Sequence, residues 1–369
     1  MKYKSSAEFV KVKLRVKRAA ENHEGIEKIL LSAFEGDKKP PGDLLDNYDE
    51  NVLVKLYFII RTIKTSSLAD KWKYYIQLIS VVSNESTFYE KYDFYPFFSH
   101  LIRNLKIDSK RLKSHDFGLL KPIIAELKKF VNPLKKAGFQ RVIACVLTAL
   151  YFISFKILQY KQSGSFELII DNKDAFLRDC EKYDKMALGY YFGRLALYRN
   201  DLNESEKYLE LSLKYCDNKR LVRKIMKILI IVKMQLNIFP SKTLFQVYDL
   251  NEFKKLSDAI KNGCVFQFEE ALEKQRDKWM SDGTYFVISE LRTLLLRNLV
   301  KNVFKVSKNR KLSFDLITDC YNIKSKKPIS RLSIINMISS LVIRSFVNGE
   351  IRIQDNILKL SREDQFPLE

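Results

Sequence analysis

The chain has 369 residues, enough for about two or three domains, and 46% of them are hydrophobic and 30% charged. This balance excludes a disordered polypeptide, and the presence of only 11 glycines and 8 prolines argues against an all-β fold rich in tight turns. The formal charge of +21 favours a polyanion as partner: nucleic acid, an acidic protein segment or an anionic membrane. Simple solubility of a lysine-rich protein is the alternative.

Motifs for catalysis or metal binding are missing from the sequence. The five cysteines are scattered without a Cys-x-x-Cys pair, which indicates neither a disulfide framework nor a zinc site and predicts a reducing compartment. The three histidines lie far apart, and the sequence contains no His-Glu-x-x-His, glycine-rich phosphate loop or Gly-x-Ser-x-Gly motif. We therefore predict a protein that is not an enzyme and has no cofactor.

The first 165 residues predict a helical repeat region. Residues 8–20 fit a strand or one face of a helix, and helix is preferred. The sequence then predicts amphipathic helices at 50–65, 68–83, 85–105 and 117–130, and an apolar helix at 139–160. The apolar run at 142–155 is shorter than the roughly 20 residues that cross a bilayer, so it predicts a buried helix and no membrane contact.

Residues 166–304 predict an irregular array of helical hairpins. A helix over 174–199 carries Gly189, Gly193 and Ala196 on one face, where small side chains permit close approach of a second helix at 204–216. This hairpin is similar to a tetratricopeptide repeat, and a looser hairpin at 256–278 turns at Asn262-Gly263.

Residues 305–369 predict a winged helix and a C-terminal tail. After a long helix over 284–306, the pattern indicates a helix at 312–322 entered near Ser313 and a third at 330–347 stopped by Asn348-Gly349. Alternating apolar residues from Ile351 to Leu360 then predict a β-hairpin. The predicted fold is thus mainly α: a tetratricopeptide-like helical array followed by a winged helix with a small β-hairpin.

This C-terminal unit is strongly basic. Between residues 296 and 361 there are thirteen basic and four acidic side chains. The loops of a winged helix and the start of its third helix face nucleic acid, and lysines suit phosphate contact. The predicted nucleic-acid-binding residues are Lys308, Arg310, Lys311, Lys324, Lys326, Lys327, Arg331 and Arg352. The alternative is a solvated basic face.

A second basic stripe lies on a predicted helix. Arg220, Arg223, Lys224 and Lys227 share one face, opposite an apolar face. Like charges at this spacing repel one another, so the stripe predicts an acidic partner, with an exposed, solvated face as the alternative.

The order of several short motifs resembles the PCI-domain family of the proteasome lid, the COP9 signalosome and an initiation factor. The resemblance covers residues 180–369, whereas over 1–160 only helical character and length agree. Its motifs, in chain order, are Tyr190-Tyr191-Phe192-Gly193-Arg194, Asp201-Leu202, Glu206-Lys207-Tyr208-Leu209, Cys216, Lys219-Arg220, Val232-Lys233-Met234, Phe239-Pro240, Phe253, Ala259-Ile260, Gly263, Phe268-Glu269-Glu270-Ala271-Leu272, Arg297-Asn298-Leu299, Val303-Phe304, Leu360-Ser361 and Phe366-Pro367-Leu368.

Within that family the chain looks most like the PCI subunit of the nuclear transcription-export complex 2 and its COP9-associated paralogue. The resemblance implies a non-catalytic subunit of a hetero-oligomer that pairs with a large PCI scaffold subunit and a small acidic DSS/Sem-type protein and binds RNA or DNA. It implies a nuclear location, including the nuclear pore, and also the cytoplasm. The alternative is a scaffold in a signalosome- or lid-like assembly without direct nucleic-acid binding.

Overall fold

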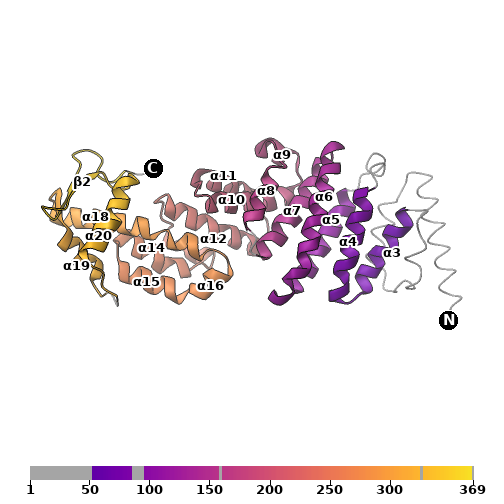
Figure 1. Ribbon diagram of the computed structural model, residues 1–369, viewed down its shortest axis with the longest axis horizontal. Coiled ribbons are helices and arrows are strands. Elements are labelled where there is room, and N and C mark those ends of the chain that lie inside the picture. Colours follow the sequence, from indigo (N-terminus) through magenta and orange to yellow (C-terminus); the bar gives the residue numbers. More distant parts are fainter. Residues whose placement is uncertain (1–51, 85–94, 158–159, 325–326, 368–369) are drawn as a thin grey trace. The chain divides into compact units, whose positions relative to one another are not determined.

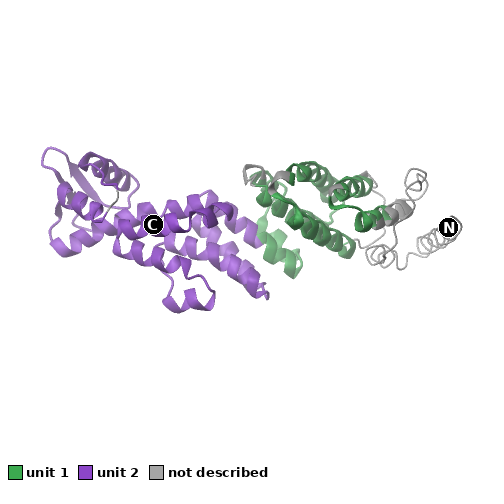
Figure 2. Cartoon of the chain, turned by 90° about the horizontal axis from the view of Figure 1, so that it is seen from below, with its two compact units in different colours: residues 1–188 green, residues 189–369 purple. Residues whose placement is uncertain are grey.

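The computed structural model describes residues 52–84, 95–157, 160–324 and 327–367 (Figure 1). These residues are mainly helical, with one small antiparallel sheet near the C-terminus, so the predicted fold class is confirmed. The chain divides into two compact units, residues 1–188 and 189–369 (Figure 2). The helix predicted over 8–20 lies outside the described residues, and the predicted boundaries at 165 and 304 stay predictions.

The first unit is built of packed helices. Its elements are α3 (Val52–Thr65), α4 (Leu68–Asn84), α5 (Tyr95–Arg111), the 3₁₀ helix η3 (Ser114–Leu120), α6 (Lys121–Lys136), α7 (Gln140–Lys156), α8 (Tyr160–Glu167), α9 (Lys173–Asp179) and the start of α10 (Lys182–Tyr198). Helix α7 is the predicted apolar helix, and it is buried because α5 and α6 both pack against it. No helix in the described ranges is long and apolar enough to cross a membrane.

The single helix predicted over 174–199 is wrong, because α9 and α10 are separate helices. Cys180 lies between them in an extended conformation, with ψ of 155°, and only 6% of its side chain is exposed. Packing of this residue therefore overrides a continuous helical pattern.

The second unit holds the end of α10, further helices and the sheet. Its elements are α11 (Leu202–Lys214), α12 (Lys219–Gln235), α13 (Lys242–Val247), α14 (Glu252–Asn262), α15 (Val265–Lys274), α16 (Arg276–Ser281), α17 (Tyr285–Ser289), α18 (Arg292–Ser307), β1 (Lys311–Ser313), α19 (Phe314–Asn322), α20 (Arg331–Ile343), β2 (Gly349–Arg352) and β3 (Ile357–Leu360).

Small residues bring α10 against α11, as predicted. A methyl group placed on Gly193 would lie 2.6 Å from Leu209 Cγ, and Ser205 Oγ donates a 2.7 Å hydrogen bond to the Gly193 carbonyl. This contact leaves no room for a larger side chain, which fixes the first hairpin of the array.

The predicted turn at Gly263 joins α14 to α15 and also packs against α18. Gly263 has a φ of +62°, and a Cβ there would lie 2.5 Å from both N and Cα of Leu299. Beside it, Asn298 Nδ2 donates a buried 2.9 Å hydrogen bond to the Ile260 carbonyl. The helical array is thereby held against the first helix of the winged helix.

The C-terminal elements have the order and pairing of a winged helix. Helices α18, α19 and α20 combine with a three-stranded sheet whose spatial order is β1-β3-β2. Strand β1 was not predicted, because its three residues pair only with the distant β3, in the register Lys311↔Lys359 and Leu312↔Leu358. Ser313 caps α19 by accepting a hydrogen bond from the Asp315 N–H, as the sequence indicated.

Two predicted helix bounds in this region are wrong. The helix predicted over 284–306 is interrupted at Glu290-Leu291, where N–H groups bond three residues back, Leu291 to Ile288 and Thr293 to Glu290, and tighten the chain. Helix α20 ends at Ile343, not at Val347, because Ser345 adopts a left-handed φ of 58° and the Phe346 N–H returns to the Leu341 carbonyl at 2.9 Å.

The tail after β3 is fastened to α18 by Arg297, which is fully buried. Its guanidinium donates to the carbonyls of Phe346 at 3.2 Å, Phe366 at 2.5 Å and Pro367 at 3.2 Å. Burial lowers the pKa of this arginine. These contacts make the tail part of the winged-helix core.

Candidate nucleic-acid interface

The first predicted basic cluster lies where α18 passes into β1. Lys308 ends α18 in a left-handed conformation, with φ of 52°, and its N–H bonds the Phe304 carbonyl. The Arg310 carbonyl accepts a 2.8 Å hydrogen bond from Leu360 N–H, which fixes the loop to β3. The side chains of Lys308, Arg310 and Lys311 are exposed, and none forms an ion pair with another described residue.

Strand pairing extends this cluster across the sheet. Lys311 stands directly opposite Lys359, and Lys359 stands opposite Glu350 on the next strand. Like charges directly opposite each other are unfavourable, and the Glu350 carboxylate, 3.9 Å from Lys359 Nζ, partly offsets that repulsion. Lys359 was not among the predicted site residues, although its alternation with buried Leu358 and Leu360 placed it on the outer face.

The second cluster occupies the loop between α19 and α20. Lys324 is exposed, with φ of 56°, and Lys327 is exposed as well, whereas Lys326 lies outside the described residues. The base of the loop is closed by Asn322, whose side chain donates to the Ile329 carbonyl at 3.0 Å and accepts from Ile329 N–H at 2.9 Å. These two hydrogen bonds hold the two ends of the loop together.

Two of the predicted phosphate-binding arginines have internal acidic partners. Arg331 lies 3.4 Å from Asp315, whose other oxygen accepts a 2.6 Å hydrogen bond from Asn356 in the hairpin turn. Arg352 donates to Glu350 at 3.0 Å, and this hydrogen bond lowers the pKa of the glutamate. Exposed ion pairs of this type are weak because water and salt screen them, so a phosphate can compete for either arginine.

The basic stripe on α12 is partly neutralised by the chain itself. Arg223 donates to the carbonyls of Tyr248 and Asp249 and lies 3.1 Å from the Asp249 carboxylate. Lys227 is paired with Asp282. The sequence did not reveal these partners, which come from later turns. Arg220 and Lys224 are exposed and have no ion-pair partner among the described residues.

Within the described ranges, no group of three or more His, Cys, Asp or Glu side chains could hold a metal ion. The geometry instead defines a helical array that ends in a winged helix with basic loops.

Comparison with known proteins identifies the relatives of this architecture. The chain is 25% identical over 224 residues to PCI domain-containing protein 2 of Xenopus laevis, covering 60% of this chain and 56% of that protein. It is 26% identical over 255 residues to Enhanced ethylene response protein 5 of Arabidopsis thaliana, covering 65% and 60%. It is also 26% identical over 197 residues to Protein CSN12 homolog of Mycosarcoma maydis, covering 48% and 43%.

The predicted resemblance to PCI-domain proteins is therefore confirmed. The matches span little more than half the length of the first of these relatives. A scan against protein-family models finds no match.

Proposed function

We propose that the chain is a non-catalytic subunit of a PCI-type complex that acts in nuclear mRNA export or a transcription-coupled step. In this proposal it pairs with a large PCI scaffold subunit and a small acidic DSS/Sem-type protein. It resides in the nucleus, including the nuclear pore, and also in the cytoplasm. The similarity to PCI domain-containing protein 2 and the winged-helix fold support the complex, while the nucleic-acid role rests on charge.

The observation that carries the nucleic-acid role is a set of exposed, unneutralised cations on the winged helix. Lys308, Arg310, Lys311 and Lys324 have no ion-pair partner among the described residues, although acids are present elsewhere on the same unit. Phosphates release counterions when they bind such side chains, which favours association with any nucleic acid. The short basic loops suit contacts to the phosphate backbone better than reading of bases.

The direct test reverses the charge of the α19–α20 loop in the full chain. Substitution Lys324→Glu, Lys326→Glu and Lys327→Glu is expected to weaken binding of labelled single-stranded RNA by at least about tenfold at low salt. The matched control reverses three exposed lysines of the helical array, Lys254→Glu, Lys255→Glu and Lys274→Glu, and so changes the net charge equally. Equal weakening in the two variants would reduce the effect to net charge and contradict a defined interface.

A second function is favoured by the similarity to Protein CSN12 homolog. In this alternative the chain is a scaffold of a signalosome- or lid-like assembly, and partner subunits cover the basic loops. Co-purification from cells, with identification of the bound subunits, separates the two. A large PCI scaffold that co-purifies with RNA supports the export complex, whereas signalosome or lid subunits without RNA support the alternative.

A further inference from the structure

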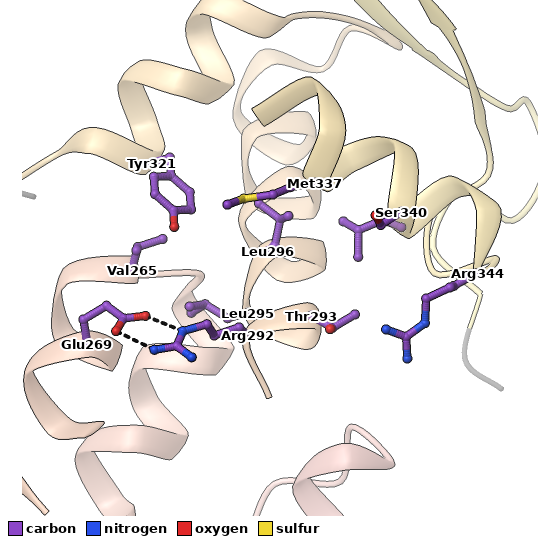
Figure 3. Close-up of a pocket in the computed structure, with 11 residues that line it drawn as sticks. Val265, Glu269, Arg292, Thr293, Leu295, Leu296, Tyr321, Met337, Ser340 and Arg344 are labelled. Atoms are coloured by element: carbon purple, nitrogen blue, oxygen red, sulfur yellow. Dashed lines mark hydrogen bonds and ion pairs between the residues drawn. The ribbon is translucent and has the colours of Figure 1, made fainter. Parts of the chain in front are cut away.

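A pocket of about 210 Å³ opens where the helical array meets the winged helix (Figure 3). Helices α15 and α18 supply Val265, Glu269, Arg292 and Leu296, and helices α19 and α20 supply Tyr321 and Met337. Most of its lining is apolar. Because the wall combines residues about eighty positions apart in the sequence, sequence patterns gave no sign of it.

The charged pair in the pocket is internally neutralised. Arg292 Nε lies 2.7 Å from one oxygen of Glu269 and its second donor lies 2.8 Å from the other, a bidentate arrangement. The hydrogen bonds that Arg292 donates to Glu269 raise the pKa of Arg292. A ligand here therefore meets apolar walls and the planar face of a fixed ion pair, with no net charge from these two groups.

The residues at the two ends of the pocket differ from the apolar residues and the ion pair at its centre. The Tyr321 ring stands at one end, three residues before exposed Lys324 of the basic loop, and Arg344 stands at the other (Figure 3). Arg344 is exposed, and its guanidinium carbon lies 5.0 Å from the Phe346 ring centroid without an ion-pair partner in the described part of the chain. Arg344 therefore supplies a cation at one end of the pocket, and the basic loop begins three residues after Tyr321 at the other end, which is compatible with a nucleic-acid strand that has phosphates on both sides of a base.

The exposed face of α20 offers few side chains that could read a duplex. In a helix-turn-helix fold this helix reads base edges with arginine, lysine, asparagine or glutamine. After Arg331, α20 carries no further basic residue and one exposed amide, Asn336, while Leu332 and Ile343 are 67% and 83% exposed. Such a face favours single-stranded nucleic acid, whose bases are unpaired and can be moved out of the base stack.

We propose that this pocket receives one unstacked base of a single-stranded nucleic acid, with the flanking phosphates on Lys324 and Arg344. The inference rests on the proposed nucleic-acid role and adds its substrate class. The base packs beside Tyr321 and Met337. Met337 is 37% exposed and its flexible thioether adapts to different bases. Stacking of this kind tolerates every base because each has an aromatic face.

The test compares two labelled RNA strands of about 16 nucleotides, one normal and one with abasic sites, which keeps every phosphate. The full chain is expected to bind the normal strand about 5- to 150-fold more tightly, as one stacked base contributes about 1–3 kcal/mol. Tyr321→Ala and Met337→Ala each reduce this preference at least several-fold. Tyr321→Phe keeps it, as does Val247→Ala, a control at a 75% exposed apolar residue of α13 that does not line the pocket.

The outcomes separate this inference from the proposed function. Equal affinity of the normal chain for both strands would overturn the base pocket and leave phosphate binding intact. Binding of neither strand would defeat the proposed nucleic-acid role itself. A preference that survives both Tyr321→Ala and Met337→Ala would place the base elsewhere. If Met337→Ala instead loses a co-purifying protein while the base preference is unchanged, the pocket holds a protein side chain and the inference is wrong.

Discussion

Replacing Gly263 by alanine tests how the array is attached to the winged helix. At this position the left-handed φ of +62° costs an L-residue about 1–2 kcal/mol. The added methyl group would also lie 2.5 Å from N and Cα of Leu299, which are backbone atoms of α18 and cannot rotate away. Overpacking of this kind costs about 1–3 kcal/mol more. Gly263→Ala should therefore lower the free energy of unfolding by about 2–5 kcal/mol in total.

Gly138 provides the matched control. It has a similar left-handed φ of +77°, but a Cβ there would meet no atom within 4 Å. Gly138→Ala should therefore cost only the conformational part, about 1–2 kcal/mol. Urea unfolding of both variants, followed by far-UV circular dichroism, measures the difference. A loss for Gly263→Ala no larger than that for Gly138→Ala would refute the close packing of the turn against α18.

Three further changes test other parts of the structure. Arg297→Met leaves the Phe346, Phe366 and Pro367 carbonyls without their donor and should lower the free energy of unfolding in urea by at least about 2 kcal/mol. Arg292→Met, which removes only an exposed ion pair, should lower it by about 1 kcal/mol or less. Equal losses of stability in the two variants would contradict the role of Arg297 in anchoring the tail. Burial raises the pKa of Asp184 to about 6, so the folded state binds the proton more tightly than the unfolded chain, and stability should fall as pH rises from about 4 to 6. Asp184→Asn should reduce this loss of stability between about pH 4 and 6. An unchanged dependence of stability on pH in that variant would contradict the assignment to Asp184. The double substitution Arg220→Glu and Lys224→Glu should weaken capture of an acidic peptide in a pull-down without changing the melting temperature. If the variant retains the peptide, the basic face of α12 is solvated and does not bind an acidic partner.

The fold was predictable where local patterns carry the information. The Gly263 turn, the Ser313 cap and the β-hairpin each depend on a few adjacent residues, and the structure confirms them. Strand β1 was missed because Lys311–Ser313 becomes a strand only by pairing with β3. The end of α20 was misplaced because the left-handed turn falls on Ser345, whereas the glycine signal lies four residues later.

The candidate site was predictable only in its loops. The exposure of Lys308, Arg310 and Lys324 follows from their position between elements, whereas Lys311 is exposed as the first residue of β1. The partners of the other cations lie far along the chain, as Asp282 does for Lys227, and no local pattern reveals them. The pocket beside α20 was missed for the same reason, because four separate helices contribute its wall.

The central claim is that the basic loops of the winged helix bind phosphates, and its most direct test is the salt dependence of RNA affinity. For the full chain and its co-purified complex, log K for single-stranded RNA should fall with log salt by about 0.7 per phosphate contacted. Reversing Lys308, Arg310 and Lys311 to glutamate should make the slope shallower by about 2, if each contacts one phosphate. Reversing Lys254, Lys255 and Lys274 should leave the slope unchanged. The same slope in both variants and the unmodified chain would contradict the claim.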